Sequence, residues 1–313
     1  MTTPPPVSPK TKTLLRGQTV AAFGRHYDVE LASGGSLSCV RRSKRTDVAC
    51  GDEVDIAVTS PGQGVIEDLL PRRTLLYRRD AFREKLIAAN VTLAAVVVAA
   101  VPTYREELLN RCLVAIEAAG IEPLIILNKA DMEETEAAAK ALQLYQRIGY
   151  QLIQLAAKQD VTPLLSYLAG QTSILVGQSG MGKSTLVNAL VPTAAARVGE
   201  ISEALDAGRH TTTASRLYHL NANSHLIDSP GMQEFGVYHL NDTDIAAAMP
   251  EFRSQLGHCR FNNCRHLQEP GCAIEQAMQA GKISVRRLEF YRQLIAQHDR
   301  FRVQDPARKH APV

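Results

Sequence analysis

One short run constrains the fold of this 313-residue chain more than any other feature: Gly177 to Ser184, which reads GQSGMGKS. The run matches the pattern G-x-x-x-x-G-K-[ST] in full, between a predicted strand, TSILVG, and a predicted helix start, KSTLVNAL. Small residues let the backbone N–H groups of such a loop point at phosphate oxygens, and the helix N-terminus favours the same negative charge. The sequence therefore predicts a phosphate-binding loop within an α/β domain, rather than a chance glycine-rich turn.

The chemistry of phosphate binding assigns roles within this loop. We expect Lys183 to reach the β- and γ-phosphates of a nucleotide and the Ser184 hydroxyl to hold Mg²⁺. The candidate nucleotide-binding residues of the loop are Gly177, Gln178, Ser179, Gly180, Met181, Gly182, Lys183, Ser184 and Thr185.

A second motif, Asn128-Lys129-Ala130-Asp131, follows the apolar run PLIIL and has the form N-K-x-D that is typical of GTPases. The Asp131 carboxylate can accept both N1–H and N2–H of guanine, whereas adenine offers no such pair of donors. Lys129 can lay its methylene stem along the base, and Asn128 can bridge the base edge and the phosphate loop. The motif predicts binding of GTP and GDP; its plainer alternative is a polar helix cap after a strand.

Two further segments fit the switches of a GTPase. Asp228-Ser229-Pro230-Gly231 matches D-x-P-G, in which Asp228 would hold Mg²⁺ through water and the Gly231 N–H would meet the γ-phosphate. In the run 208–213, GRHTTT, one of three threonines could ligand Mg²⁺, and Thr212 is our candidate. His210 is either a water-positioning residue or a plain loop histidine. Met232 follows the D-x-P-G motif and cannot orient water, so we expect slow hydrolysis that a partner accelerates.

The order of these motifs is unusual, because N-K-x-D precedes the phosphate loop in this chain. Six strand-like runs alternate with helix-like stretches, and they correspond to the strands of a GTPase in the order 4-5-6-1-2-3. This order arises when the N- and C-termini of an ordinary GTPase domain are joined and the chain is cut after the D-x-P-G switch. We therefore predict a circularly permuted GTPase domain whose switch runs directly into the C-terminal region.

The remaining sequence predicts a multidomain chain. Short alternating runs separated by turns predict a small β-barrel of the oligonucleotide-binding type near the N-terminus, and the first residues are rich in Pro, Thr and Lys. The expected divisions are a disordered lead-in over 1–13, the barrel over 14–85, the GTPase domain over 86–240 and a helical zinc module over 241–313.

The C-terminal module carries a cluster of metal-binding side chains: Cys259, Cys264, His266 and Cys272. Three thiolates and one imidazole form a complete tetrahedral set for one structural Zn²⁺, with no position left open for catalysis. Buried thiols or a disulfide are the alternative, and His258 is the rival imidazole. After the cluster, five arginines decorate a predicted helix, which is either a solvated helix face or an RNA-facing surface: Arg286, Arg287, Arg292, Arg300 and Arg302.

Composition limits the cellular setting. The longest apolar run, residues 93–101, is too short to cross a bilayer, and the N-terminus lacks the apolar core of a signal peptide. Of the six cysteines, three are isolated and three are clustered near the C-terminus. This distribution fits a reducing cytoplasm better than a disulfide scaffold. The chain has a net charge of +3, and its basic ends flank an acidic middle, a charge pattern that favours a polyanionic partner.

Taken together, the barrel, KLIAANV, NKAD, GQSGMGKS, GRHTTT, DSPG and the Cys/His cluster resemble the bacterial family of small ribosomal subunit-dependent GTPase A. The resemblance covers nearly the whole chain. It implies a late assembly factor of the small ribosomal subunit, a barrel that touches ribosomal RNA, and GTP hydrolysis stimulated by the subunit. We expect a monomeric, cytoplasmic protein with no membrane association. An RNA-binding zinc protein with a structural nucleotide, or an ATP-using P-loop enzyme, would be the alternatives.

Overall fold

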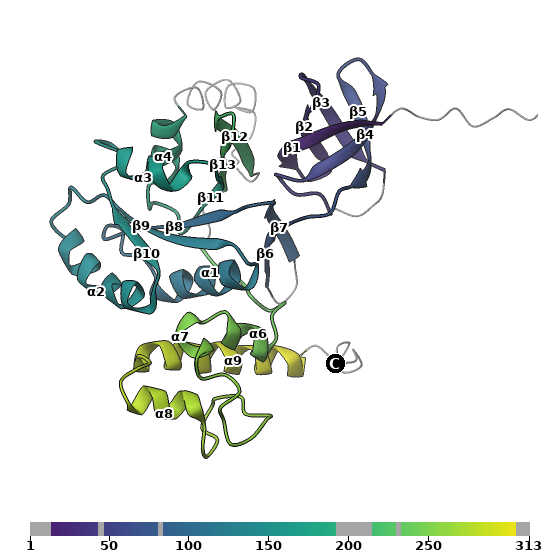
Figure 1. Cartoon of the computed structure of the whole chain (residues 1–313). Coiled ribbons are helices and arrows are strands. Elements are labelled where there is room, and N and C mark those ends of the chain that lie inside the picture. The colour runs from purple at the N-terminus through teal and green to yellow at the C-terminus, as the bar shows by residue number, and fades with distance from the viewer. Residues whose placement is uncertain (1–13, 43–46, 81–83, 192–214, 230–232, 305–313) are drawn as a thin grey trace, which may run out of the picture.

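A computed structural model describes residues 14–42, 47–80, 84–191, 215–229 and 233–304. Three parts follow one another along the chain in Figure 1: a β-barrel, an α/β region and a helical C-terminal module. The barrel and the α/β region share one continuous eleven-stranded sheet, in which β1 of the barrel pairs with β12. None of the helices in the described ranges is long and apolar enough to cross a membrane.

The barrel is built from five short strands. They are β1 (Leu15–Phe23), β2 (His26–Leu31), β3 (Ser36–Arg41), β4 (Glu53–Ser60) and β5 (Gln63–Leu69). Neighbours pair in the order β1-β2-β3-β5-β4, and β4 pairs back with β1, which closes the barrel. Alternate side chains such as Tyr27, Val29 and Ile56 fill its interior. The predicted small β-barrel is confirmed, and β1 and β2 are joined by a turn at Gly24.

The α/β region contains all six strands that the sequence predicts. They are β8 (Leu93–Ala99), β9 (Glu122–Asn128), β10 (Gln151–Gln154), β11 (Thr172–Val176), β12 (Arg216–Asn221) and β13 (Ser224–Asp228). The strand order is β10-β9-β8-β11-β13-β12, and every neighbouring pair is parallel except β13 with β12. This order places the phosphate-loop strand β11 at the centre, next to β8 and β13.

Helices cover both faces of this sheet, which explains why its strands are continuously apolar. The helices are α1 (Glu106–Ala118), α2 (Thr135–Ile148), α3 (Thr162–Leu168) and α4 (Lys183–Leu190). Val96 and Val98 of β8 belong to the same apolar cluster as α1, whereas Val97 belongs to the cluster with α3 and α4. Figure 1 shows α1 and α2 on one face and α3 and α4 on the other.

The C-terminal module packs beneath α1. It contains α6 (Asp242–Ala247), α7 (Pro250–Arg253), α8 (Ala273–Gln279) and α9 (Val285–Gln304). The apolar stripe predicted for the last helix is buried, with Leu288, Tyr291 and Leu294 each about 1% exposed. These residues belong to the same apolar cluster as α1 and the sheet. The module therefore shares its core with the α/β region instead of relying on the metal cluster alone.

A two-stranded ribbon lies between the barrel and the α/β region. It consists of β6 (Leu75–Arg79) and β7 (Glu84–Ala89). The segment that follows the D-x-P-G motif joins this ribbon: the Arg79 N–H donates to the Gly236 carbonyl, and the Tyr238 N–H donates to the Arg79 carbonyl. A Cβ at position 236 would lie 2.3 Å from the Arg79 carbonyl oxygen, so only glycine fits this close approach. Further along, Tyr238 stacks on His298 of α9.

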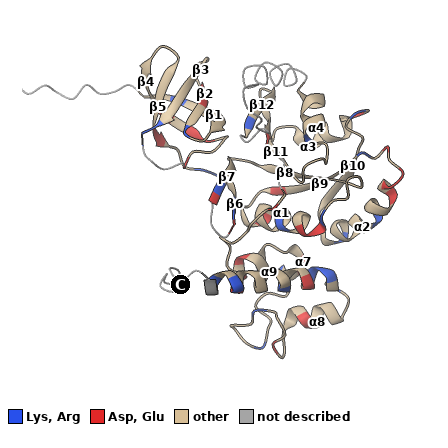
Figure 2. Cartoon of the chain, turned by 180° about the vertical axis from the view of Figure 1, so that it is seen from behind, with Lys and Arg blue, Asp and Glu red and all other residues tan. Residues whose placement is uncertain are grey.

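The arginines of α9 make more contacts within the protein than a solvated helix face requires. Figure 2 shows basic residues along α9, but most of them are used within the protein. Arg286 pairs with Glu106, Arg292 with Glu275 and Arg302 with Asp242. Arg287 is only 1% exposed and contacts Glu251 at 2.5 Å and Asn110 of α1 at 2.5 Å. The prediction of a solvated face is therefore wrong for Arg287, which is buried, whereas Arg286 and Arg302 stay exposed at the surface. Arg286 and Arg287 bind the module to α1, and Arg292 and Arg302 form ion pairs within the module.

Removing the Arg287 side chain should destabilise the protein strongly, because Glu251 would keep a buried charge without a partner. We expect Arg287→Met to lower the free energy of unfolding by about 3–5 kcal/mol. The double change Arg287→Met with Glu251→Met replaces both charges by apolar groups and should restore most of that loss. Urea unfolding in zinc-containing buffer measures both proteins. A double variant no more stable than the single one would show that the ion pair is not the cause.

Candidate nucleotide site and metal centre

The predicted phosphate loop connects β11 to α4, which begins at Lys183 with Gly182 as its N-terminal cap residue. Gly177, Gly180 and Gly182 all have positive φ angles, a conformation that glycine adopts without steric cost. Gly177 also lies against the neighbouring strand, since a Cβ there would be 2.4 Å from the Val97 carbonyl oxygen. The loop backbone therefore requires glycine at these positions, and Met181 anchors the loop with a side chain buried in the core.

Lys183 lies inside the curl of the loop. Its ammonium group donates to the carbonyl oxygens of Gly177 and Gln178 at 2.8 and 2.9 Å, and the residue is 6% exposed. Burial lowers the pKa of Lys183, and the charge of Asp228 partly opposes that shift. Burial raises the pKa of Asp228 in turn, with Lys183 opposing it. Ser184, the next residue, is exposed. The loop therefore carries a cation and a hydroxyl, and the Asp228 carboxylate is close enough to Lys183 to act on its charge.

Asn128 joins three loops. Its side-chain amide donates to the Met181 carbonyl at 2.9 Å and accepts from the Ala157 N–H at 3.0 Å. A Cβ on Gly182 would lie 2.2 Å from the Asn128 amide nitrogen, so that glycine makes room for the contact. The segment around Ala157 is thereby fixed next to the N-K-x-D motif.

The other residues of the N-K-x-D motif face the phosphate loop or solvent. Lys129 has a φ of +61° and donates from its ammonium group to the carbonyls of Val101 and Gly180, at 2.6 and 2.9 Å. Thr135 holds the turn by donating to the Lys129 carbonyl. Asp131 is exposed at the start of the turn, where its carboxylate is accessible to a ligand. N-K-x-D and the phosphate loop are thus in contact although some fifty residues separate them in the chain.

The switch residues are only partly described. Asp228 ends β13, and the Ser229 hydroxyl donates to the Leu175 carbonyl of β11 at 2.7 Å, which fixes the start of D-x-P-G beside the phosphate loop. Gly231 and Met232 lie outside the described residues, as do His210 and Thr212 of the GRHTTT run.

Arg105 is a residue that the sequence analysis missed. Its backbone N–H donates to the Gln178 side chain in the phosphate loop, and its guanidinium donates to the Gln233 carbonyl just after D-x-P-G. No pattern in the sequence distinguishes this loop arginine from other surface arginines, because its partners come from 73 and 128 positions further along the chain.

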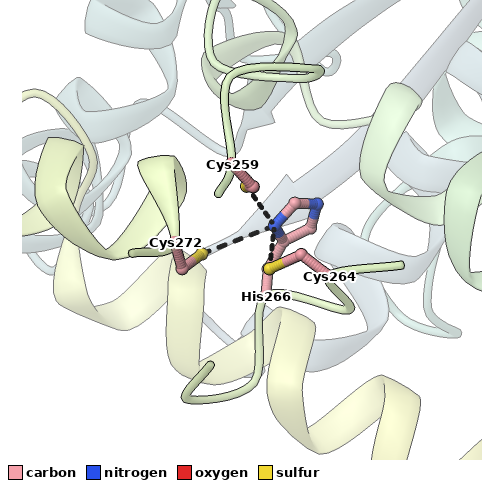
Figure 3. Close-up of side chains that lie close together, drawn as sticks. All are labelled: Cys259, Cys264, His266 and Cys272. Carbon is pink, nitrogen blue, oxygen red and sulfur yellow. Dashed lines mark hydrogen bonds between the residues drawn. The ribbon is translucent and has the colours of Figure 1, made fainter. Parts of the chain in front are cut away.

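The cluster in the C-terminal module is assembled as predicted. The Sγ atoms of Cys259, Cys264 and Cys272 lie 3.5, 3.6 and 3.5 Å from the Nδ1 atom of His266 (Figure 3). All four ligand atoms lie within 4.8 Å of one another. The rival imidazole, His258, is exposed and is not part of this group.

This arrangement fits a zinc ion. Tetrahedral zinc with Zn–S and Zn–N bonds of ~2.3 and ~2.0–2.1 Å places sulfur and nitrogen about 3.6 Å apart. The surrounding loop supports the ligands: the Ala273 N–H points at the Cys259 sulfur, at 3.3 Å. The Glu269 carboxylate accepts from the backbone N–H groups of Arg265 and Leu267. Four protein ligands leave no open coordination position, which is characteristic of a structural site.

Comparison with known proteins gives consistent matches. A sequence model of the family described as RsgA GTPase matches residues 69–238. A protein named Small ribosomal subunit biogenesis GTPase RsgA, from Nitrosospira multiformis, is 54% identical over 91% of this chain and 92% of that protein. A protein of the same name from Nitrosomonas europaea is 52% identical, again over 91% and 92%.

Solved structures agree with the fold. The crystal structure of YjeQ from Thermotoga maritima has a TM-score of 0.70 at 25% identity and covers 92% of this chain and 99% of that chain. The crystal structure of YloQ, described as a circularly permuted GTPase, has a TM-score of 0.67 at 24% identity over 96% and 99%.

The fold and the site define a circularly permuted P-loop GTPase, with an N-terminal barrel and a C-terminal Cys₃His group that fits a zinc ion. The extent and identity of the matches go further than the class: the chain belongs to the RsgA GTPase family, and it is a GTP hydrolase.

Proposed function

We propose that this GTPase acts in the late maturation of the small ribosomal subunit, which it binds and which stimulates its hydrolysis of GTP to GDP and phosphate. The observation that carries the proposal is 54% and 52% identity, over nine-tenths of the chain, to proteins named for small ribosomal subunit biogenesis. We further propose that it works as a cytoplasmic monomer, with domains bounded at 14–85, 86–240 and 241–313 and a disordered lead-in before them.

The geometry supports a specific set of nucleotide contacts. We propose that Asp131 reads guanine, that Lys129 covers the base and that Asn128 keeps the base-binding and phosphate-binding loops in register. Lys183 would exchange its carbonyl partners for the β- and γ-phosphates, with the backbone N–H groups of Gly177 to Thr185 around them. Ser184 and Asp228 would hold Mg²⁺, which when bound would neutralise charge on the phosphate oxygens.

The roles of the remaining switch residues stay proposals from the sequence. Thr212 would complete the Mg²⁺ ligands, and the Gly231 N–H would meet the γ-phosphate. His210 is the candidate for positioning water, because Met232 cannot do so. The Cys₃His group would hold one structural Zn²⁺ and would play no part in hydrolysis.

Coupling between the nucleotide and the rest of the protein follows from the contacts of residues 233–239. This segment continues directly from the switch and joins the ribbon through Gly236, contacts Arg105 through Gln233 and stacks on α9 through Tyr238. A change at D-x-P-G would therefore reach the barrel side and the zinc module together.

The guanine contact can be tested by changing its acceptor into a donor. Asp131→Asn should weaken GTP binding by about 100-fold or more, because an amide nitrogen would face the N–H groups of guanine. Xanthosine triphosphate carries a carbonyl where guanine carries its amino group, so the variant should bind it better than GTP. Titration with both nucleotides measures the preference. Unchanged preference for GTP would exclude Asp131 as the guanine reader.

Ribosome binding is tested by sedimentation with purified small ribosomal subunits and, as a control, large subunits. We expect the protein to sediment with small subunits when a non-hydrolysable GTP analogue is present and to dissociate when GDP replaces it. Equal sedimentation with both subunits, or with neither, would contradict the proposed function and leave a GTP hydrolase that acts on another partner.

A further inference from the structure

The loop between the first two metal ligands presents an unusual set of side chains. It comprises Arg260, Phe261, Asn262 and Asn263, and all four are exposed. Phe261 is 43% exposed, which is high for a large apolar side chain. The guanidinium carbon of Arg260 lies 5.3 Å from the centre of the Phe261 ring, within range of a cation–π contact. The connection between α7 and α8, which carries this loop, lies on the side of α9 away from α1 and the sheet (Figures 1 and 2).

Arg260 stands apart from most other arginines of the module. Six arginines in residues 241–302 form ion pairs within the protein: Arg253, Arg265, Arg286, Arg287, Arg292 and Arg302. Within the described part of the chain, only Arg260 and Arg300 of this module form none, and Arg260 alone lies against an exposed aromatic ring. Its charge therefore remains available to an external anion.

The backbone of this loop is fixed before any partner arrives. The Arg260 N–H donates to the Gly271 carbonyl at 3.0 Å, and the Cys264 N–H donates to the Phe261 carbonyl at 3.2 Å. Gly271 has a positive φ, and a Cβ there would lie 2.8 Å from the Arg260 Cβ, so the two ends of the knuckle are closely packed. Cys259 and Cys264 flank the loop as metal ligands. A loop backbone held in this way loses little conformational freedom on binding.

We propose that Phe261 is a stacking platform for one unpaired base of an RNA strand, with Arg260 beside it for the phosphate or the base and the two asparagines for base edges. This proposal rests on the proposed function, which supplies a partner made largely of RNA. Aromatic rings next to guanidinium and amide groups are the set that recognises splayed-out bases in single-stranded RNA. Protein–protein interfaces are also rich in aromatic rings and arginine, so docking of the Phe261 ring into a protein pocket is the other outcome that the test must separate.

The chain contains no tryptophan, which allows a direct test. Phe261→Trp places the only indole of the protein at the platform, and stacking with a base quenches indole fluorescence. Val285→Trp is the matched control, because Val285 lies in the same module and is 53% exposed. On addition of small ribosomal subunits with the non-hydrolysable GTP analogue, we expect strong quenching in the Phe261→Trp protein and little change in the control.

Affinity for the subunit gives a second readout. Phe261→Ala should weaken binding by about fivefold or more, whereas Phe261→Tyr, which keeps the ring, should bind like the unchanged protein. Zinc content must be one ion per chain in every variant. Binding without quenching, or a blue shift without quenching as the ring enters a protein pocket, would overturn the platform and leave the proposed function intact. Failure of the unchanged protein to sediment with subunits would overturn both.

Discussion

Gly182→Ala is expected to abolish useful nucleotide binding while leaving the fold in place. Gly182 has a φ of +94°, which an alanine adopts only with strain, and its new Cβ would lie 2.2 Å from the Asn128 amide nitrogen. The strain and the loss of the Asn128 hydrogen bonds together should weaken GTP and GDP binding by about 100-fold. Titration with a fluorescent guanine nucleotide measures this loss directly.

Gly180→Ala is the matched control for that change. Gly180 has a similar φ of +83° in the same loop, but its nearest neighbour to a new Cβ would be the Pro102 ring, at 3.1 Å. Strain is therefore present without the collision with Asn128, and we expect a much smaller loss of affinity. Equal losses in the two variants would show that backbone strain alone matters and that Asn128 does not link the base-binding and phosphate-binding loops.

Loss of the metal is expected to unfold the segment of the C-terminal module that surrounds the metal ligands. Structural zinc contributes about 10–16 kcal/mol of binding free energy in small zinc domains, so Cys264→Ala should release zinc and expose residues 254–284 to protease. None of the residues 254–284 belongs to the nucleotide-binding loops, so GTP affinity should change by no more than a few-fold. Metal analysis, limited proteolysis and nucleotide titration measure the three effects.

His258→Ala provides the control for the metal centre. His258 precedes Cys259 and is exposed, whereas His266 is 7% exposed with Nδ1 facing all three sulfurs. The His258→Ala protein should keep one zinc ion and its resistance to protease. Loss of zinc from this variant, with zinc retained in His266→Ala, would show that His258 and not His266 is the fourth ligand.

Local patterns predicted the parts of this protein that local chemistry determines. The phosphate loop, the N-K-x-D motif and the six alternating strands are each encoded within a few residues, and their permuted order is visible in the chain itself. The glycine at 182 is part of the loop pattern, but its fit to Asn128 emerges only when the two loops meet in the fold.

The sequence failed where a side chain depends on a distant partner. Arg287 looks like any arginine on an exposed helix face, yet Glu251 and Asn110 enclose it from positions 36 and 177 residues away. Residues 236–238 are likewise attached to the ribbon by backbone hydrogen bonds. Such bonds do not depend on the side chains, so the sequence does not reveal them. The contact is reflected in the sequence only at position 236, where no residue larger than glycine fits against the Arg79 backbone.

The most direct test of the account is the rate of GTP hydrolysis with and without purified small ribosomal subunits, with Lys183→Ala as the control. Lys183 lies inside the phosphate loop, so its removal should eliminate turnover without unfolding the chain. We predict slow hydrolysis by the protein alone, a large increase with small subunits and no increase with the variant. A rate that small subunits leave unchanged, while GTP stays tightly bound, would contradict a ribosome-coupled GTPase.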